Sequence, residues 1–275
     1  MSEEQALLDI MAGLRSGTVV PYIGPGIWAT TATAPAHPTD ALALAAKLTE
    51  KASVPHKIRK NLTAAAQYIE NFKHRKTLTG LMNSAFVERA TPAALHEFLG
   101  SLHQLPLVVD AWYDDALQQT LARNPSWGQV QGVSQAEHHG EWVRYYTAQG
   151  ELSDAETAEK WNTLLYRPLG SCAPAQNYIV SDSDYVEILT EIDIQTPIPP
   201  IVQQRRSGKH FLFLGCRFTN QLDRIFARQI MKRSSDRHWA ILAENPTRNE
   251  ARFLKEMNIT RLAVPLSTLP DYTVN

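Results

Sequence analysis

A glycine-rich turn at residues 24–26 is the first segment of this sequence whose pattern could do chemistry. The hydrophobic run VVPYI leads into Gly24, Pro25 and Gly26, which Ile27 follows. Where a buried strand ends in such a turn, backbone N–H groups can point at a phosphate group, and glycine lets the backbone approach it closely. Pro25 has no N–H and removes one donor. Gly24, Gly26 and Ile27 can still donate, so the turn predicts a phosphate site with one donor missing.

A second group of candidate ligand-binding residues follows later hydrophobic runs. Gly215 ends the run HFLFLG, and Thr219 and Asn220 come shortly after it, where they would suit a ribose or a phosphate group. Glu244 follows the run HWAIL, at the position of a carboxylate that pairs with ribose hydroxyls. With the first turn, these residues predict a nucleotide site at the carboxyl ends of several strands. The alternative for the glycines is a tight turn that holds no ligand.

Asp110 and two adjacent histidines are the candidates for acid–base chemistry. Asp110 ends the apolar run LPLVVD, on the side where open α/β sheets bind ligands. Carboxylates at such a junction also commonly stabilise the start of a helix, and this is the alternative for Asp110. His138 and His139 are neighbours in sequence and do not share a helix face, so we do not expect them to bind a metal. They could instead reach a ligand pocket and supply a base.

Cysteine usage and the start of the chain limit the class of protein. Cys172 and Cys216 are the only cysteines and form no CxxC motif, so neither a zinc ribbon nor a disulfide framework is expected, and no metal. The opening MSEEQALLDIM is acidic and helical in pattern, unlike a signal peptide. No apolar run approaches the roughly 20 residues of a membrane span. We expect a soluble, cytoplasmic protein without a membrane contact.

The composition is that of a folded chain with no dominant charge. Of its 275 residues, 44% are hydrophobic and 20% are charged, and the formal net charge is -1. This balance gives no global positive field for nucleic acid. The short basic stretches KHRK and MKRSSDR are typical of solvated helix faces, so no nucleic-acid partner is expected.

Helical and strand patterns alternate along the chain. We expect a helix that ends at Gly17, a strand at Val19–Ile23, and mostly helical conformation over 41–102, with Thr39 as a possible cap. The later expected elements are strands at 105–110, in HFLFLGC, in HWAILAE and in ITRLAV, and helices at 220–233 and 248–257. Such alternation implies parallel strands joined by right-handed crossovers. The predicted fold is α/β: a Rossmann-like doubly wound parallel sheet with a mostly helical insertion or subdomain.

We expect one domain, residues 1–275, with two distinctive segments. Residues 41–102 form a helical module within it. Residues 123–162 are predicted to be an irregular insertion, because 128–150 is polar, rich in aromatic residues and without a clear periodicity.

Four segments, in this order, resemble those of SIR2-like domains. YIGPGIW is similar to the family's opening Gly-Ala-Gly segment, and LVVDAWYDDALQQTL to its Thr-Thr-Asn-Tyr-Asp segment and the helix after it. LLYRPLGS followed by YIVSDSDYVEIL resembles the Lys-Leu-His-Gly-Ser and Asp-Tyr elements, and FLFLGCRFTNQLDRIFARQ the second glycine loop. The resemblance covers nearly the whole chain. It is closer to the bacterial type than to zinc-ribbon deacetylases, which carry four cysteines.

The resemblance implies a ligand, but two positions of the family's catalytic mechanism differ in this sequence. It implies NAD, a related adenine dinucleotide or ADP-ribose as the cofactor. Family members that hydrolyse NAD use an Asn to orient the nicotinamide ribose and a His as base. Here the Asn position is Trp112 and the His position is Leu169. Neither an indole nor an isobutyl group can accept a proton, so little of the family mechanism is expected to remain.

Three functions therefore stay open. The first is a degenerate SIR2-like protein that binds a nucleotide without family catalysis and acts as a sensor or regulatory module for a protein partner or a homo-oligomer. The second is an NAD glycohydrolase, rather than a protein deacetylase, with relocated catalytic residues such as Asp110 with His138 or His139. The third is an interaction scaffold that holds no ligand.

Overall fold

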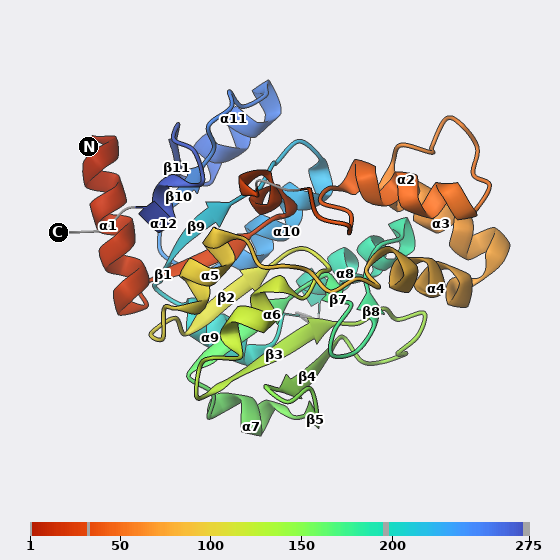
Figure 1. Ribbon diagram of the computed structural model, residues 1–275, viewed down its shortest axis with the longest axis horizontal. Helices are drawn as coiled ribbons and strands as arrows, with labels where there is room; N and C mark the ends of the chain where they lie inside the picture. Colours follow the sequence, from red (N-terminus) through yellow and green to blue (C-terminus); the bar gives the residue numbers. More distant parts are fainter. Residues whose placement is uncertain (1, 32–33, 195–197, 272–275) are drawn as a thin grey trace.

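A mixed sheet runs through the middle of the molecule, with helices on both of its faces (Figure 1). The computed structural model describes residues 2–31, 34–194 and 198–271. In this part of the chain the main sheet has nine strands in the order β11-β10-β9-β1-β2-β6-β3-β4-β5, and β7 pairs with β8 in a separate small sheet. The strands are β1 (Val19–Ile23), β2 (Leu107–Asp110), β3 (Trp127–Gly132), β4 (Val143–Thr147), β5 (Leu152–Ser153), β6 (Thr163–Arg167), β7 (Gly170–Ser171), β8 (Asn177–Tyr178), β9 (His210–Leu214), β10 (His238–Ile241) and β11 (Ile259–Leu262).

The helices lie between these strands in sequence. They are α1 (Glu3–Ser16), the 3₁₀ helix η1 (Pro25–Thr30), α2 (Ala41–Lys51), α3 (Leu62–Lys73), α4 (Arg75–Ala85), α5 (Ala94–Gly100), α6 (Ala116–Leu121), α7 (Ala155–Glu159), α8 (Asp182–Ile194), α9 (Pro200–Arg206), α10 (Gln221–Met231), α11 (Arg248–Glu256) and α12 (Thr268–Asp271). Helix α1 ends as its pattern predicts, because Gly17 adopts a φ of 69° and its N–H closes the last turn. The predicted cap of α2 is wrong by one residue: Asp40, not Thr39, accepts from the N–H of Ala43 at 2.7 Å.

The strands from β11 to β3 are parallel, and those inside the edge strand β11 are buried on both faces. In β9, Phe211 and Phe213 face one apolar cluster, while Leu212 and Leu214 face the other. Helices α8, α9, α10 and α11 supply the first cluster, and α1, α5, α6 and α12 supply the second. The predicted Rossmann-like doubly wound α/β fold is therefore confirmed, and only β4 and β5 are antiparallel in the described part of the main sheet.

The strand order reverses at β1. The chain passes from β1 to β2 on one side of it and later returns to β9 on the other side. Ile23 at the end of β1 lies in register with Asp110 of β2 and with Leu214 of β9. Ligands of open α/β sheets bind outside the carboxyl ends of the strands at such a reversal. The region beyond these three residues is therefore where a functional site is expected.

Residues 128–150 are not irregular throughout: β3 and β4 lie within this range, and the prediction is wrong for these two strands. Strand β3 is fully buried and pairs parallel with β6, and β4 and β5 continue the sheet beyond it. One polar side chain of this strand is fully buried and hydrogen-bonded: Gln131 donates to the carbonyl of Ala173 at 2.6 Å and accepts from the amide of Asn177 at 2.8 Å. That residues 123–162 are an insertion within the single domain stays a prediction.

Helices α2, α3 and α4 form a module at one end of the molecule, on the right in Figure 1. With α5, they bear out the mostly helical conformation predicted for 41–102. The module has its own apolar cluster, which also takes in Trp112, Tyr113, Tyr178 and Val180 from the sheet side. The module is thus attached to the sheet domain by apolar packing around Trp112.

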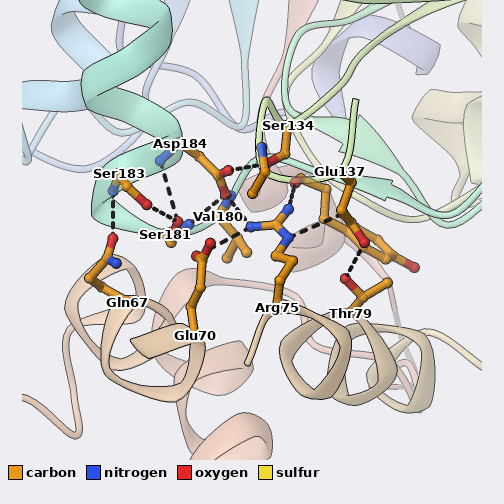
Figure 2. A network of polar contacts seen from close by, with 12 residues as sticks. Gln67, Glu70, Arg75, Thr79, Ser134, Glu137, Val180, Ser181, Ser183 and Asp184 are labelled. Carbon is orange, nitrogen blue, oxygen red and sulfur yellow. Dashed lines mark hydrogen bonds and ion pairs between the residues drawn. The ribbon is translucent and has the colours of Figure 1, made fainter. Parts of the chain in front are cut away.

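Arg75 adds a polar attachment to this packing (Figure 2). Its guanidinium contacts Glu70 of α3 at 3.4 Å, Glu137 of the β3–β4 loop at 3.1 Å and Asp184 of α8 at 2.8 Å. It also donates to the carbonyl of Tyr178 at 2.5 Å. One cation therefore joins the module to two separate segments of the sheet domain.

Asp184 is the most buried carboxylate of this network. The hydroxyl of Ser134 donates to it at 2.5 Å, and the N–H groups of Val180 and Ser181 donate at 2.9 and 3.0 Å. Ser181 in turn accepts from the N–H of Asp184 at 3.3 Å. This reciprocal pair is a capping box at the start of α8.

We expect Arg75→Met to destabilise the protein by about 3 kcal/mol, because the buried Asp184 would lose its cation. The midpoint of urea unfolding, followed by circular dichroism, measures this loss. Arg252→Met is the matched control, since Arg252 is 78% exposed and pairs with Glu256 on the surface of its own helix. Its midpoint should remain close to that of the wild type. Equal losses in the two variants would contradict the attachment assigned to Arg75.

Candidate functional site

The two glycine loops at the carboxyl ends of β1 and β9 bind each other. The N–H of Gly24 donates to the carbonyl of Leu214 at 2.9 Å, and the N–H of Gly26 donates to the carbonyl of Gly215 at 2.9 Å. The N–H of Ile27 donates to the carbonyl of Gly24 at 3.3 Å and begins the η1 turn. The expectation that these three N–H groups are free to donate to a phosphate is therefore wrong for this conformation. Pro25 has none to offer.

Close packing of the two loops requires glycine at three positions. A Cβ atom on either Gly24 or Gly26 would lie 2.7 Å from the carbonyl oxygen of Gly215. Gly215 adopts a φ of 64°, and a Cβ there would lie 2.2 Å from the nitrogen of Ile27. The glycines that suggested a phosphate site thus have a structural role whether or not a ligand binds.

The loop after Gly215 is held by a buried carboxylate. Arg217 donates to Glu250 through Nε at 2.8 Å and Nη2 at 3.1 Å, and it also pairs with the exposed Glu244. Burial acts to raise the pKa of Glu250, but hydrogen bonds from Arg217 and Thr247 lower it to about 2. Glu244 therefore lies next to the loop and has Arg217 as its partner, and its contact with a ribose stays a prediction.

Thr219 and Asn220 lie exposed at the start of α10. The side chain of Asn220 accepts from the N–H of Asp223 at 2.8 Å and caps the helix. Thr219 contributes its carbonyl to the side chain of Arg224 at 2.9 Å. A capping role accounts for Asn220, and contact of either residue with a ligand stays a prediction.

Asp110 lies at the end of β2 and forms an ion pair with Arg167 at the end of β6. The Oδ2 and Nη2 atoms are 3.3 Å apart, and both side chains are buried. Arg167 also donates to the carbonyls of Trp112 and Asp114. Burial raises the pKa of the Asp110 carboxyl to about 7, although the Arg167 guanidinium acts to lower it. The pKa of this carboxyl therefore lies near neutrality.

Asp223 is a site residue that the sequence analysis missed. Burial raises the pKa of its carboxyl to about 7, although the Asn220 amide acts to lower it. Its negative charge acts on Cys216 and Tyr22, whose pKa values burial also raises. Its spacing after Asn220 suggests only a helix start, so no sequence signal marks its burial.

Trp112 and Leu169, which the sequence analysis aligns with the family's Asn and His, both pack among apolar side chains. Trp112 is 5% exposed, and its indole N–H donates to the carbonyl of Pro38 at 3.0 Å. Its ring lies 5.1 Å from that of Tyr113 and 6.3 Å from that of Phe86. Leu169 packs between the module and the core of the sheet domain. Neither side chain can take up a proton.

His138 and His139 do not join Asp110. His138 lies on the β3–β4 loop, where its Nε2 is 3.2 Å from the Asn177 side chain, and His139 is exposed. Asp110 instead pairs with Arg167. The structure therefore does not assemble the predicted alternative acid–base pair. Within the described ranges, no three His, Cys, Asp or Glu side chains form a group that could hold a metal ion.

Two other histidines gather around Asp114, and the sequence analysis missed both. Asp114 accepts from the indole N–H of Trp28 at 2.9 Å, and the Nε2 of His37 lies 3.9 Å from it. The ring centre of His96 lies 4.7 Å from that of Trp28, with the two planes tilted by 43°. Burial lowers the pKa of both imidazoles, to about 4 for His96. These residues come from distant segments, so only the fold brings them together.

The fold and the site define a Rossmann-like α/β protein with a helical module beside the strand reversal. A model of the SIR2-like domain family matches residues 106–262, more than half of the chain. The chain therefore belongs to the SIR2-like family. The match includes Asp110, Trp112, Leu169 and Gly215, whereas the first glycine turn precedes it.

One solved structure that matches this chain is a Sir2 structure. It is reported under the heading "Structural Basis for the Mechanism and Regulation of Sir2 Enzymes" and shares 12% sequence identity with this chain. The TM-score is 0.40, with 98% of this chain and 94% of that chain covered. No curated protein matches the sequence. Among the described helices, none is long and apolar enough to cross a membrane.

Because the two glycine loops are closely packed, we expect Gly26→Ala to lower the free energy of unfolding by about 1 to 3 kcal/mol. The new Cβ would force the loops apart. Thermal unfolding without ligand measures it. Gly80→Ala is the matched control, since no atom lies within 4 Å of a Cβ at this helical position. It should raise stability by about 0.5 to 1 kcal/mol. A Gly26→Ala variant as stable as the wild type would show that the loops are not tightly packed.

The buried imidazole of His96 predicts a loss of stability in acid. Its Nδ1 accepts from the N–H of Ala93 at 3.1 Å, so the fold favours the neutral ring. The folded state holds its pKa at about 4, against 6.5 for the ordinary group, and therefore binds the proton less strongly than the unfolded chain. The free energy of unfolding should decrease as the pH falls from about 6.5 to about 4.

His96→Asn tests this, because an amide oxygen can accept the same N–H without titrating. The melting temperature of the variant should fall less steeply than that of the wild type over this range. His238, whose pKa burial also lowers to about 4, should account for part of the remaining slope. Parallel curves for variant and wild type would rule out His96 as a contributor.

Proposed function

We propose that this protein is a degenerate SIR2-like nucleotide-binding protein. It binds an NAD-type or ADP-ribose-type ligand beyond the carboxyl ends of β1, β2 and β9 and does not carry out the family's catalysis. The observation that carries the proposal is the apolar packing of the buried Trp112 and the partly buried Leu169, at the two positions that we assign to the family's Asn and His. Cleavage of the nicotinamide bond requires an oriented nucleophile and a proton acceptor, and neither position supplies one.

Retained features of the strand ends support the binding part of the proposal. Gly24, Gly26 and Gly215 keep the backbone of both loops free of side chains where a pyrophosphate would approach. Glu244 is 77% exposed beside the second loop, within reach of a ribose. Arg217 adds a cation next to it. This set offers groups for both the sugar and the phosphates.

The hydrogen bond between the two glycine loops supports a role as a sensor. A phosphate that takes the N–H of Gly26 must replace the carbonyl of Gly215, which now accepts it at 2.9 Å. Binding is thus coupled to a movement of the two loops, and a protein partner or a second copy of the chain could read that movement. Such coupling is the physical requirement for a regulatory module.

An NAD glycohydrolase is the second candidate, and one observation favours it. The pKa values of Asp110 and Asp223, both about 7 through burial, lie where a general acid or base works best at neutral pH. This hypothesis replaces His138 and His139 by Asp223 as the partner of Asp110. It requires hydrolysis without a base at the position of Leu169.

We expect binding without turnover. At 100 times its dissociation constant, NAD or ADP-ribose should stabilise the wild type by about 2.7 kcal/mol. Glu244→Gln should weaken the affinity roughly tenfold, because a carboxylate that accepts from ribose hydroxyls is lost. Glu256→Gln, at another exposed glutamate that pairs with arginine, should bind as the wild type does. Titration calorimetry measures the affinities of the wild type and of the two variants. The absence of heat with every adenine dinucleotide and with ADP-ribose would leave the scaffold hypothesis.

Turnover is measured as nicotinamide release by chromatography. The wild type and Leu169→His should stay at background, while Trp112→Asn combined with Leu169→His should release nicotinamide. Trp112→Phe with Leu169→His is the control, since it restores the base without the orienting amide. Removal of the buried indole costs stability, so the assay is run well below each variant's melting temperature. Hydrolysis by the wild type that Asp110→Asn abolishes would establish the glycohydrolase instead.

A further inference from the structure

The helical module carries an excess of positive charge that the whole chain does not show. From the start of α2 to the end of α4, residues 41–85 include eight Lys and Arg but two Glu, a formal net charge of +6. Because the whole chain has a net charge of -1, the remaining residues carry -7. The basic runs HKIRK and KHRK, which separately are typical of solvated helix faces, both belong to this module. Positive charge is therefore concentrated at one end of the molecule, on the right in Figure 1.

Seven of the eight cations are exposed. Within the ranges that the structure describes, none of the seven forms an ion pair; they are Lys47, Lys51, Lys57, Arg59, Lys60, Lys73 and Lys76. The eighth is the partly buried Arg75 at the contact with the sheet domain. Of the two glutamates, Glu70 pairs with Arg75, and only Glu50 is exposed. The outer surface of the module thus presents cations whose charge no neighbouring carboxylate takes up.

The stability of the helices does not account for three of these cations. Arg59 and Lys60 directly precede the N-cap of α3, and Lys76 lies in the first turn of α4. Neither helix has an acidic residue in its first turn, and the positive end of a helix dipole disfavours cations there. Lys51 and Lys73 lie in the last turns of α2 and α3, where the dipole favours them. An anion bound from outside would relieve the repulsion among the first three.

An exposed aromatic ring accompanies the cations. Phe72 is 65% exposed in the last turn of α3, directly before Lys73, and its ring centre lies 4.4 Å from that of Tyr68. One group of cations precedes α3 and another follows it, and a helix of 12 residues is about 18 Å long. The module therefore offers two groups of cations with an aromatic ring beside the second. Surfaces that bind single-stranded nucleic acid combine cations for the phosphates with aromatic rings on which bases stack.

We propose that this surface of the helical module binds single-stranded nucleic acid. Six of its seven exposed cations are lysines, which contact phosphates as point charges and do not read base edges as a bidentate group does. Binding therefore depends little on base sequence. The ring of Phe72 stacks on a base, which a single strand exposes and a duplex does not. This surface shares no residue with the proposed nucleotide site, so either function can fail without the other.

Fluorescence anisotropy with a labelled oligothymidylate of about 20 nucleotides tests the role of the cations. The logarithm of the affinity should fall with the logarithm of the salt concentration with a slope of about -3.5 to -5, as for five to seven phosphate contacts. Lys57→Gln combined with Lys60→Gln should weaken binding about tenfold or more and make the slope less steep by about 1.4. Lys160→Gln combined with Lys255→Gln is the matched control, since it removes the same charge at two exposed lysines of the sheet domain. This control should bind as the wild type does.

Phe72→Ala tests the stacking. It should lower the affinity for the oligothymidylate roughly tenfold and leave the salt dependence unchanged, because no phosphate contact is lost. Leu152→Ala is its control, since Leu152 is a 69% exposed apolar residue on β5. Its affinity should equal that of the wild type. A duplex of the same length should bind more weakly than the single strand.

Polyglutamate of equal charge separates nucleic acid from an acidic protein. It should displace the oligothymidylate only at much higher concentration, because it has no bases to stack on Phe72. The proposal is overturned if the oligothymidylate does not bind at low salt or if the Lys57 and Lys60 double variant binds as tightly as the wild type. It is also overturned if the control pair of lysines loses as much affinity, if Phe72→Ala has no effect, or if polyglutamate competes equally well.

Discussion

The hydrogen bond from the N–H of Gly26 to the carbonyl of Gly215 joins the two halves of the sheet at the point where its strand order reverses. It forms because no side chain separates the loops after β1 and β9, and a Cβ on either partner would prevent it. The same contact fixes η1, from which Trp28 reaches Asp114. The geometry of the strand ends therefore depends on a backbone contact that three glycines permit.

The rest of the site consists of side chains that are buried and already in contact with one another. Asp110 and Arg167 leave water together, and Arg167 also takes up the carbonyls of Trp112 and Asp114, although its Nε and Nη1 remain unpaired. Breaking such a pair would leave a buried charge, which is costly. Trp112 fills the neighbouring space with apolar surface and attaches the helical module. Within this arrangement of Asp110, Arg167 and Trp112, the group that can accept a proton is the carboxylate of Asp110.

The sequence predicted the fold where its local pattern matched the final environment. The bounds of β1 were correct because all five residues of this strand are buried, and Gly17 ended α1 as its conformational freedom implies. Strand β3 was missed because Gln129 and Gln131 are buried, and the hydrogen bonds that satisfy Gln131 come from a segment more than 40 residues away. Local patterns carry no record of such long-range partners.

The same distinction between local and long-range features applies to the candidate site. Its segments could be found because glycine turns and strand ends leave a local trace, whereas the convergence of His37, His96 and Asp114 could not, since each comes from a different element. The sequence also carried no indication of whether the backbone N–H groups of the glycine loops already have hydrogen-bond partners. A glycine sequence shows that a backbone N–H can approach a phosphate, but it does not show that a neighbouring carbonyl has already accepted that N–H.

Movement of Gly215 cannot remain local. Two residues later Arg217 is held by the buried carboxylate of Glu250 at the start of α11, and Asn220 caps α10. A displacement that frees the N–H of Gly26 must therefore strain the Arg217 pair or carry α10 and α11 with it. Because a paired, buried carboxylate such as Glu250 is costly to separate from its cation, movement of the helices is the less costly response. Any ligand that opens the loops would thus change the surface formed by α10 and α11, which is where a partner would detect it.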